Sequence, residues 1–506
     1  MVAQKIIALC LGLAAGGMPL YAKSKAETPQ SGNSAAGKIL GGELRFGIAS
    51  EPVTLDPLSP SNTADGRSIL FNVFEGLVKP SPDGALVPAV AESYRIDEEG
   101  RVYSFTLRPG VRFQDGSPVT AEDVLFSLKA AAEAGFNGFN QIETMEKSPS
   151  GLTIVLKSPD REFLPYLTVG VVPKSNPNRE KNPIGTGPFS IASYDTQRAL
   201  VLVKNPYYWQ SGLPYLDKVT CVFVADQDAL FLALQAGTID SAGIPGSLAD
   251  QLDPGRFDIL ASPSNSAQLL GLNNKVKPLD DVRVRQAINY GIDVPLIIQA
   301  AFYGRGEPSG SPLIPGLSKY YDSTLKDPYP ADVQKAKALL AQAGYEQGFP
   351  LVLTVPSNYT IHVDTAQVLV NQLGKIGIRV TIKLVDWATW LAEVYRGRRY
   401  EATIISLDAP TVSPRGFLDR YVSSAGSNFL NFSSPRYDEI YAEALEENQE
   451  SRRIDLYRQA QQIISQEAAG VYIQDIWSFR VFPKGRYDGV QNYPLYVTDF
   501  STVYRK

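Results

Sequence analysis

A carboxylate in a loop of few charges is the residue best suited to holding a charged ligand. Asp408 is the only carboxylate between Glu401 and Asp419, and it follows an apolar run that is typical of a strand. A buried carboxylate needs a cation or several hydrogen-bond donors to offset its desolvation, and a ligand ammonium would provide both. An aspartate beside Pro410 can also cap a turn in an exposed loop. The residues alone leave both roles of Asp408 open.

Two tryptophans and an arginine extend the set of candidate ligand-binding residues. Trp387 and Trp390 lie three positions apart on an expected helix, and tryptophan is seldom exposed without a cause. We expect Trp387 to face a ligand and Trp390 to lie in the core. Arg415 offers a guanidinium to a ligand carboxylate, although a solvated loop arginine is the interpretation that we favour.

The residue types that catalysis and metal binding need are scarce. The chain has one histidine, His362, together with three methionines and two cysteines. A serine triad would need His362 as its base, but we expect a turn residue there, and neither G-x-S-x-G nor H-E-x-x-H occurs. So few soft ligands argue against a transition-metal or haem site. A glycosidase built on two carboxylates leaves no such motif, and nothing specific indicates one. We therefore predict no catalytic residue, no metal and no cofactor.

The N-terminus is typical of a cleavable export signal. One lysine precedes an apolar run that is too short and too rich in glycine for a membrane span. We predict a signal peptide over 1–22 and a disordered lead-in over 23–40. Lipid attachment at Cys10 would need a small residue before it, and because Leu9 stands there we do not favour it. Cys221 is then the remaining cysteine, in an apolar strand-like run, where we expect a buried inert thiol.

Composition and length place the chain among ordinary soluble proteins. It has 506 residues, which is too many for one core, so we expect two or three domains. Hydrophobic residues make up 44% and charged residues 20%. The net charge is -5 and there is no basic run, which argues against nucleic acid as a partner.

Strand and helix patterns alternate along the chain. Thr120 and Asp123 form the pattern of a capping box, in which each side chain accepts from an orphan backbone N–H at a helix start. We expect helices over 65–78, 121–134, 333–343, 366–373 and 457–468, and strands over 43–48, 103–107 and 378–385. Helix-then-strand order predicts an α/β fold with at least partly parallel sheets.

Seven segments, spaced in order, resemble a known family, the extracytoplasmic solute-binding proteins (family 5) of peptide/nickel-type ABC importers. They are SEPVTLDP (50–57), the run from Ala91 to Leu128, NPIGTGPF (182–189), NPYYW (205–209), DVRVRQAINYGID (281–293), 329–345 and 437–464.

The resemblance implies a two-lobed periplasmic-binding-protein fold of type II, large class, with an extra domain inserted in the first lobe. Lobe I would take 41–82, 187–271 and 478–506, the inserted subdomain 83–186, and lobe II 272–477. The chain would cross between lobes twice, near 271–274 and 473–477. Ligand would bind between lobes that hinge shut around it, which is the domain closure typical of periplasmic binding proteins.

The resemblance also implies roles for particular residues. In peptide-binding members an acid in W-x-x-D-Y-x-x-P holds the ligand's ammonium. Counting back four places from Pro414 gives Pro410, and Asp408 lies two residues further back. The usual Trp is absent, with Ser406 near its place. Either the loop is two residues longer here or the ammonium clamp is missing.

Three further residues are expected near the cleft by the same resemblance. Glu51 stands where members line the cleft, or else it is a turn residue before Pro52. Trp477 lies in the second crossover, where closure would bury it, and Asp475 beside it is a secondary candidate.

We expect a monomeric binding protein, not an enzyme, in the periplasm or outside the cell. It would capture short peptides and deliver them to the permease subunits of an ABC transporter. Three alternatives stay open: the same fold binding an oligosaccharide, an opine-like compound or a metal chelate; a sensor or chaperone on this fold; and a secreted hydrolase.

Overall fold

The computed structural model describes residues 38–506, apart from residues 63, 225, 410 and 496. Contacts between residues group Ile39–Lys506 into one compact unit. The expected signal peptide over 1–22, the candidate lipid site Cys10 and nearly all of the lead-in over 23–40 lie outside the described residues. In the part of the chain that is described, no helix is long and apolar enough to cross a membrane.

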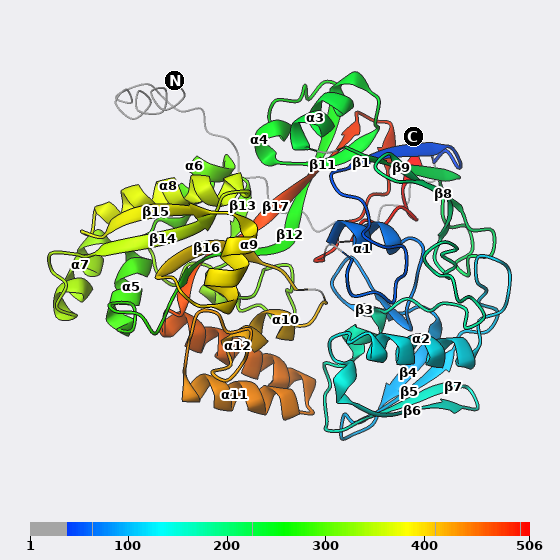
Figure 1. Ribbon diagram of the computed structural model, residues 1–506, viewed down its shortest axis with the longest axis horizontal. Coiled ribbons are helices and arrows are strands. Elements are labelled where there is room, and N and C mark those ends of the chain that lie inside the picture. The colour runs from blue at the N-terminus through cyan, green and yellow to red at the C-terminus, as the bar shows by residue number, and fades with distance from the viewer. Residues whose placement is uncertain (1–37, 63, 225, 410, 496) are drawn as a thin grey trace. The chain divides into compact units, whose positions relative to one another are not determined.

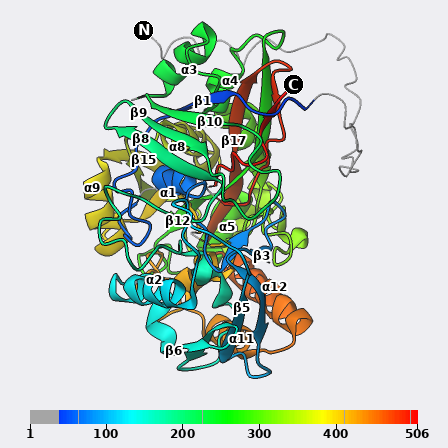
Figure 2. The same ribbon diagram turned by 90° about the vertical axis from the view of Figure 1, so that its right-hand side faces the viewer.

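One large mixed sheet organises the fold (Figure 1). Its two long strands, β12 (Phe257–Leu272) and β17 (Gly470–Pro483), pair antiparallel, and Figure 2 shows them side by side. At one end lie β16 (Ala402–Leu407), β14 (Pro350–Pro356) and β15 (Arg379–Val385), with β13 (Gly306–Pro308) on β17. At the other end lie β11 (Ser241–Ile244), β1 (Glu43–Ile48), β10 (Lys218–Phe223), β9 (Ala199–Lys204) and β8 (Phe189–Asp195).

We call the end with β13–β16 and its helices lobe II, and the end with β1 and β8–β11 lobe I. In lobe II, β14 runs parallel to both β15 and β16. Figure 1 shows α6 (Val294–Phe302) and α8 (Thr360–Gly374) on one face of these strands, and α5 (Val282–Tyr290) and α7 (Val333–Gln342) on the other. Helices on both faces explain why β14 and β16 are nearly continuous apolar runs.

The remaining elements complete the lobes. Lobe II adds α9 (Trp387–Thr389), α10 (Arg415–Leu418), α11 (Pro435–Glu446) and α12 (Glu450–Gln466). Lobe I adds α1 (Ala64–Leu70), α3 (Gln227–Ala236), α4 (Gly246–Ala249), β18 (Tyr487–Asp488) and β19 (Tyr504–Arg505).

A separate small sheet forms what we call the small-sheet subdomain. Its strands lie in the order β4 (Ala91–Ile96), β5 (Val102–Leu107), β7 (Gly151–Leu156) and β6 (Ile142–Ser148), all antiparallel. Helix α2 (Ala121–Glu133) packs on this sheet through buried Val124 and Leu128. A short hairpin of β2 (Val78–Pro80) and β3 (Leu86–Pro88) lies between α1 and this sheet in the chain.

The predicted α/β class with a partly parallel sheet is confirmed, and so is the capping box of Thr120 and Asp123. Cys221 is buried in β10, and its burial raises the pKa of the thiol to about 12, so it stays protonated. His362 lies in the first turn of α8 as expected, buried against Gln268. The boundaries of the lobes and of the inserted domain stay predictions.

The helix expected over 65–78 is wrong in its length, because α1 ends at Leu70. The carbonyl of Val73 accepts from the backbone of Gly187 and from the side chain of Gln114, which replaces the helical pattern with contacts across the fold. Tertiary contacts of this kind often override local propensity.

Candidate functional site

A cavity of about 360 Å³ lies where lobe I, the small-sheet subdomain and the loop after β16 meet. Its apolar wall includes Phe71, Phe74, Phe136, Tyr166 and Val412. Ligand sites in proteins commonly measure about 300–1,000 Å³, so this one suits a compact ligand. We call it the interlobe cavity.

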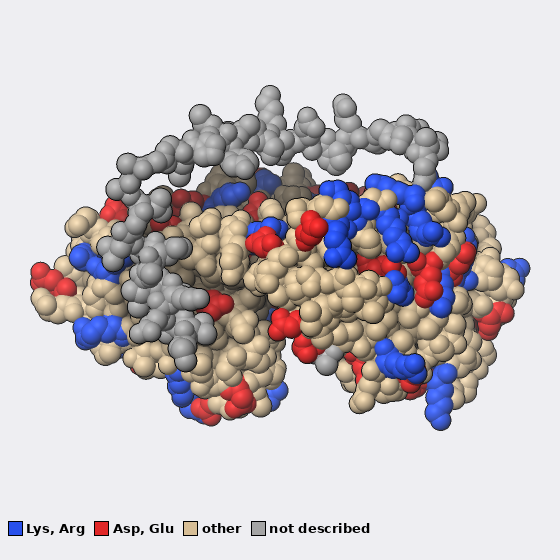
Figure 3. Space-filling model, turned by 90° about the horizontal axis from the view of Figure 1, so that it is seen from above, with Lys and Arg blue, Asp and Glu red and all other residues tan. Residues whose placement is uncertain are grey.

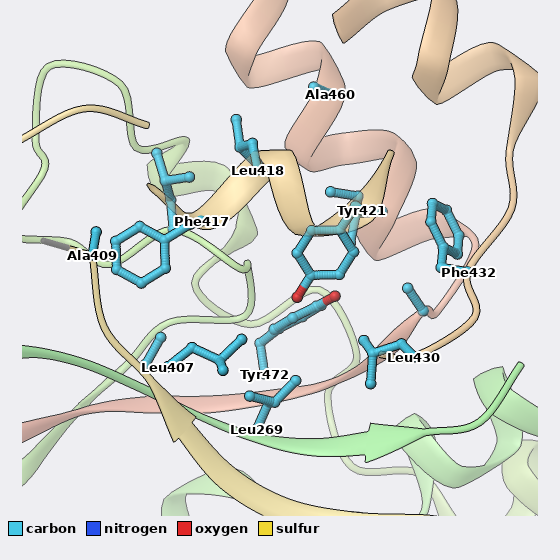
Figure 4. Packing of buried hydrophobic residues seen from close by; sticks show 14 of the residues in the cluster. Leu269, Leu407, Ala409, Phe417, Leu418, Tyr421, Leu430, Phe432, Ala460 and Tyr472 are labelled. Carbon is cyan, nitrogen blue, oxygen red and sulfur yellow. The ribbon is translucent and has the colours of Figure 1, made fainter. Parts of the chain in front are cut away.

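The loop after β16 brings Asp408 to the interlobe cavity. The parallel strands β14, β15 and β16 have their carboxyl ends on the same side of the sheet. Ligands of open α/β sheets bind just outside the carboxyl ends of the strands. Figure 4 shows Leu407 and Ala409 in the lobe II core near Phe417. Because alternate residues of an extended chain point to opposite sides, Asp408 between them is exposed and lines the cavity.

Among the described residues, which do not include the nearby Pro410, none provides a cation or a hydrogen-bond donor to the Asp408 carboxylate. Its backbone carbonyl accepts from Arg420 Nη2 at 3.0 Å, which holds the loop. The carboxylate is thus available for a ligand cation.

The opposite wall carries a buried ion pair. Glu75 is 4% exposed, and its carboxylate lies 2.8 Å from Lys79 Nζ. Tyr208 Oη and Trp209 Nε1 also donate to Glu75, at 2.8 and 2.7 Å. Burial, and then the charge of Glu75, raise the pKa of Tyr208. The charges of Glu75 and Lys79 are therefore already paired with each other, and Trp209, which the family motif NPYYW contains, adds a hydrogen bond to Glu75.

Arg67 also lines the interlobe cavity, from α1. Its Nη1 donates to the carbonyl of Asn62 at 2.6 Å, and the side chain is exposed. No motif in the sequence indicates a binding role for Arg67, Phe71, Phe74 or Lys79. The spacing of the two phenylalanines is ordinary for a core, so only the fold reveals them as part of a site.

Two of the predicted site residues are held by partners elsewhere in the protein. The Glu51 carboxylate accepts from Tyr194 Oη and from the backbone of Gln197, both at 2.9 Å. Arg415 is mostly buried and pairs with Asp160 of the small-sheet subdomain at 2.5 Å, so it is not a solvated loop arginine. Neither lines the interlobe cavity.

The other predicted residues do not line the interlobe cavity. Trp387 follows β15, is 37% exposed and stacks at 5.0 Å on Trp390, which is buried as expected. Ser406 is half-buried in β16, and Trp477 packs half-buried against a lobe I cluster. Asp475 is fully buried in β17. Among the described lining residues, Asp408 is the one member of the predicted set.

Charges on the outer surface are mixed. On the face in Figure 3, basic and acidic side chains lie close together and neither sign covers the face. In lobe I, for example, Asp240 pairs with both Arg45 and Arg486. The charges of the cavity itself are therefore the better guide to a ligand.

Asp475 makes the stability of the protein depend on pH. Burial raises the pKa of its carboxyl to about 6, although the backbone N–H groups of Ser266 and Ser264 donate to it. Because the folded state favours the protonated acid, the carboxyl destabilises the protein progressively as the pH rises from about 4 to about 6, and the cost levels off near 3 kcal/mol above that pH.

We therefore expect Asp475→Asn to raise the melting temperature relative to the wild type at pH 8 but not at pH 4. Thermal unfolding of both proteins across this range checks the prediction. An equal difference at the two pH values would show that folding does not raise the pKa of this carboxyl.

A known family matches most of this chain. The family model for bacterial extracellular solute-binding proteins, family 5 Middle, matches residues 85–429. The chain belongs to family 5 of the bacterial extracellular solute-binding proteins. The predicted family is thus confirmed, and the two-lobed fold predicted with it is supported by solved structures.

Three relatives of this family 5 protein show what related chains bind. The glutathione-binding protein GsiB of Shigella flexneri serotype 5b is 29% identical over 446 residues, which are 83% of this chain and 86% of that protein. The structure of DppA from Helicobacter pylori in complex with the peptide STSA has a TM-score of 0.75 and 26% identity, over 92% of this chain and 98% of that one. The structure of AgaA from A. tumefacien R10 in complex with agropinic acid has a TM-score of 0.73 and 27% identity, over 92% and 99%.

Proposed function

We propose that the protein is the extracytoplasmic solute-binding component of an ABC importer, and that it captures short peptides in the interlobe cavity. The observation that carries the proposal is Asp408, a carboxylate on the cavity wall with no described partner. A peptide's terminal ammonium would satisfy it with a charge-assisted hydrogen bond. The peptide in the DppA complex and the name of GsiB support the same ligand class.

The apolar wall supports a peptide rather than a small inorganic ion. Phe71, Phe74, Phe136 and Val412 offer area for apolar side chains, while Asp408 fixes the terminus. Such a division between apolar area and few polar groups is usual for sites that bind organic ligands.

A second candidate is a non-peptide solute of similar size and charge. The likeness to AgaA, whose structure holds agropinic acid, favours an opine-like compound. The departure of this loop from the usual peptide motif at Pro410 is consistent with that ligand.

The proposed mode of action is hinge closure. β12 and β17 join the two lobes, so bending of these strands would open and close the cavity. The closed monomer would then dock on the permease subunits of the transporter. DppA, described as ABC transporter-associated, supports this partner.

Asp408→Asn is expected to weaken the binding of di- and tripeptides by about 2 kcal/mol, roughly thirtyfold, because the ammonium loses a charged acceptor. Calorimetric titration would use the tightest-binding member of a di- and tripeptide panel and its N-acetyl form. The wild type should prefer the free N-terminus and the variant should not.

Asp455→Asn is a suitable control, since Asp455 lies on α12 with a side chain that is 62% exposed. It should bind like the wild type. An unchanged affinity in Asp408→Asn would remove this residue from the site.

A further inference from the structure

The charged residues on the wall of the interlobe cavity are unequally paired. The described lining residues include Arg67, Glu75, Lys79 and Asp408. Glu75 and Lys79 form a buried pair at 2.8 Å, and Lys79 also donates to Tyr208 Oη at 3.0 Å. Glu75 and Lys79 therefore have little to offer a ligand. Of these four residues, Arg67 remains as the available cation and Asp408 as the available anion.

Arg67 and Asp408 approach the cavity from different lobes. Arg67 comes from α1 in lobe I and Asp408 from the end of β16 in lobe II. Among the described side chains, which do not include those of residues 63–65, none is an acidic partner of Arg67, and its hydrogen bond goes to a neutral carbonyl of Asn62. A ligand that bridges the two walls would meet a carboxylate at one end and a guanidinium at the other.

The hydrogen bond to Asn62 orients the guanidinium. Asn62 is buried, and its side-chain oxygen accepts from the backbone of Thr54 at 3.2 Å, so the anchor is itself held in place. One Nη1 hydrogen is used, and the other donors of the guanidinium fork remain. The planar guanidinium can donate two parallel hydrogen bonds to one carboxylate, whereas the ammonium of a lysine side chain cannot.

We propose that Arg67 receives the carboxylate of the bound ligand and so selects short zwitterionic solutes. The inference rests on the proposed function, and it narrows the ligand class to molecules whose ammonium and carboxylate both fit within one cavity of about 360 Å³. Peptides longer than these would place their terminal carboxylate beyond the reach of Arg67.

The test compares peptides with and without a terminal carboxylate. The probes are a pool of di- and tripeptides of Ala, Leu and Phe and the same pool as C-terminal amides. Native mass spectrometry measures their capture by the wild type, Arg67→Gln, Arg67→Lys and a control, Arg198→Gln, whose lobe I side chain is 83% exposed. Thermal unfolding of each variant identifies any that fails to fold.

We expect the wild type and the control to bind the acids about tenfold to a hundredfold more tightly than the amides. Arg67→Gln should lose this preference, and Arg67→Lys should keep part of it because it retains the charge without the fork.

Three results would overturn the inference. If the wild type binds acids and amides equally, or if folded Arg67→Gln keeps the preference, Arg67 does not receive the carboxylate, while peptide binding itself stands. If the wild type captures neither pool, the proposed peptide ligand fails, and the role of Arg67 falls with it.

Discussion

Replacing Arg453 with methionine is expected to weaken the contact between lobe II and the small-sheet subdomain by about 3–5 kcal/mol, because it leaves a buried charge without its partner. Arg453 Nε lies 3.4 Å from Glu162 Oε1, and the two side chains are 8% and 6% exposed. Burial raises the pKa of Glu162, whereas Arg453 opposes that rise. Ser413 also donates to Glu162, at 3.1 Å.

Glu162 and its donor Ser413 lie close in the chain to residues that line the interlobe cavity. Val412 lines the cavity and Ser413 follows it, while Glu162 precedes Pro165 and Tyr166 of the opposite wall. Loss of the pair should therefore favour separation of the walls, where water can hydrate Glu162, and should weaken ligand binding as well.

Thermal unfolding and small-angle scattering without ligand measure this effect. Arg453→Met should have a lower melting temperature than the wild type or scatter as a more open molecule. Adding Glu162→Gln to this variant should restore much of the lost stability. The control is Arg452→Met, whose exposed pair with Glu443 is worth at most about 1 kcal/mol. The prediction is wrong if Arg453→Met and Arg452→Met behave alike in both measurements.

Gly185→Ala is expected to cost about 3 kcal/mol of folding free energy, at the upper end for overpacking. An added Cβ would lie 2.1 Å from the carbonyl oxygen of Val73 and 2.6 Å from Phe74. The segment cannot withdraw easily, because Gln114 hydrogen-bonds the backbone of Gly185 and Gly187 bonds the carbonyl of Val73. The motif NPIGTGPF therefore needs glycine here for close packing.

Chemical denaturation followed by tryptophan fluorescence checks this prediction. Because Phe74 lines the interlobe cavity, the variant should also bind ligand more weakly. Gly426→Ala is the matched control, since nothing lies within 4 Å of its added Cβ. Equal stability of the two variants would contradict the packing explanation.

Local patterns in the sequence were sufficient where the interactions are local. The capping box of Thr120 and Asp123 uses groups three residues apart, and it forms as predicted. The helix over 65–78 fails where Val73 bonds to Gly187, a partner far along the chain. No periodicity of the segment itself contains that information.

In the site, too, contacts between segments that are distant in the chain could not be predicted from the sequence. Asp408 was identifiable because the family resemblance implies a ligand-holding acid in this loop, and Asp408 is the only carboxylate between Glu401 and Asp419. Arg67 was not, because α1 has no motif and its role appears only when the fold brings it to the wall opposite Asp408. Glu51 and Arg415 were plausible as free charges, but the fold gives them Tyr194 and Asp160 as partners.

Native mass spectrometry of the exported protein, purified without denaturation, tests the central proposal most directly. Bound molecules would be released by gentle activation and fragmented, and empty protein would be offered the di- and tripeptide pool. The proposal predicts released or captured masses that fragment as short peptides and that bind less well to Asp408→Asn. A single non-peptide mass in the wild type, or empty protein that captures no peptide, would contradict it.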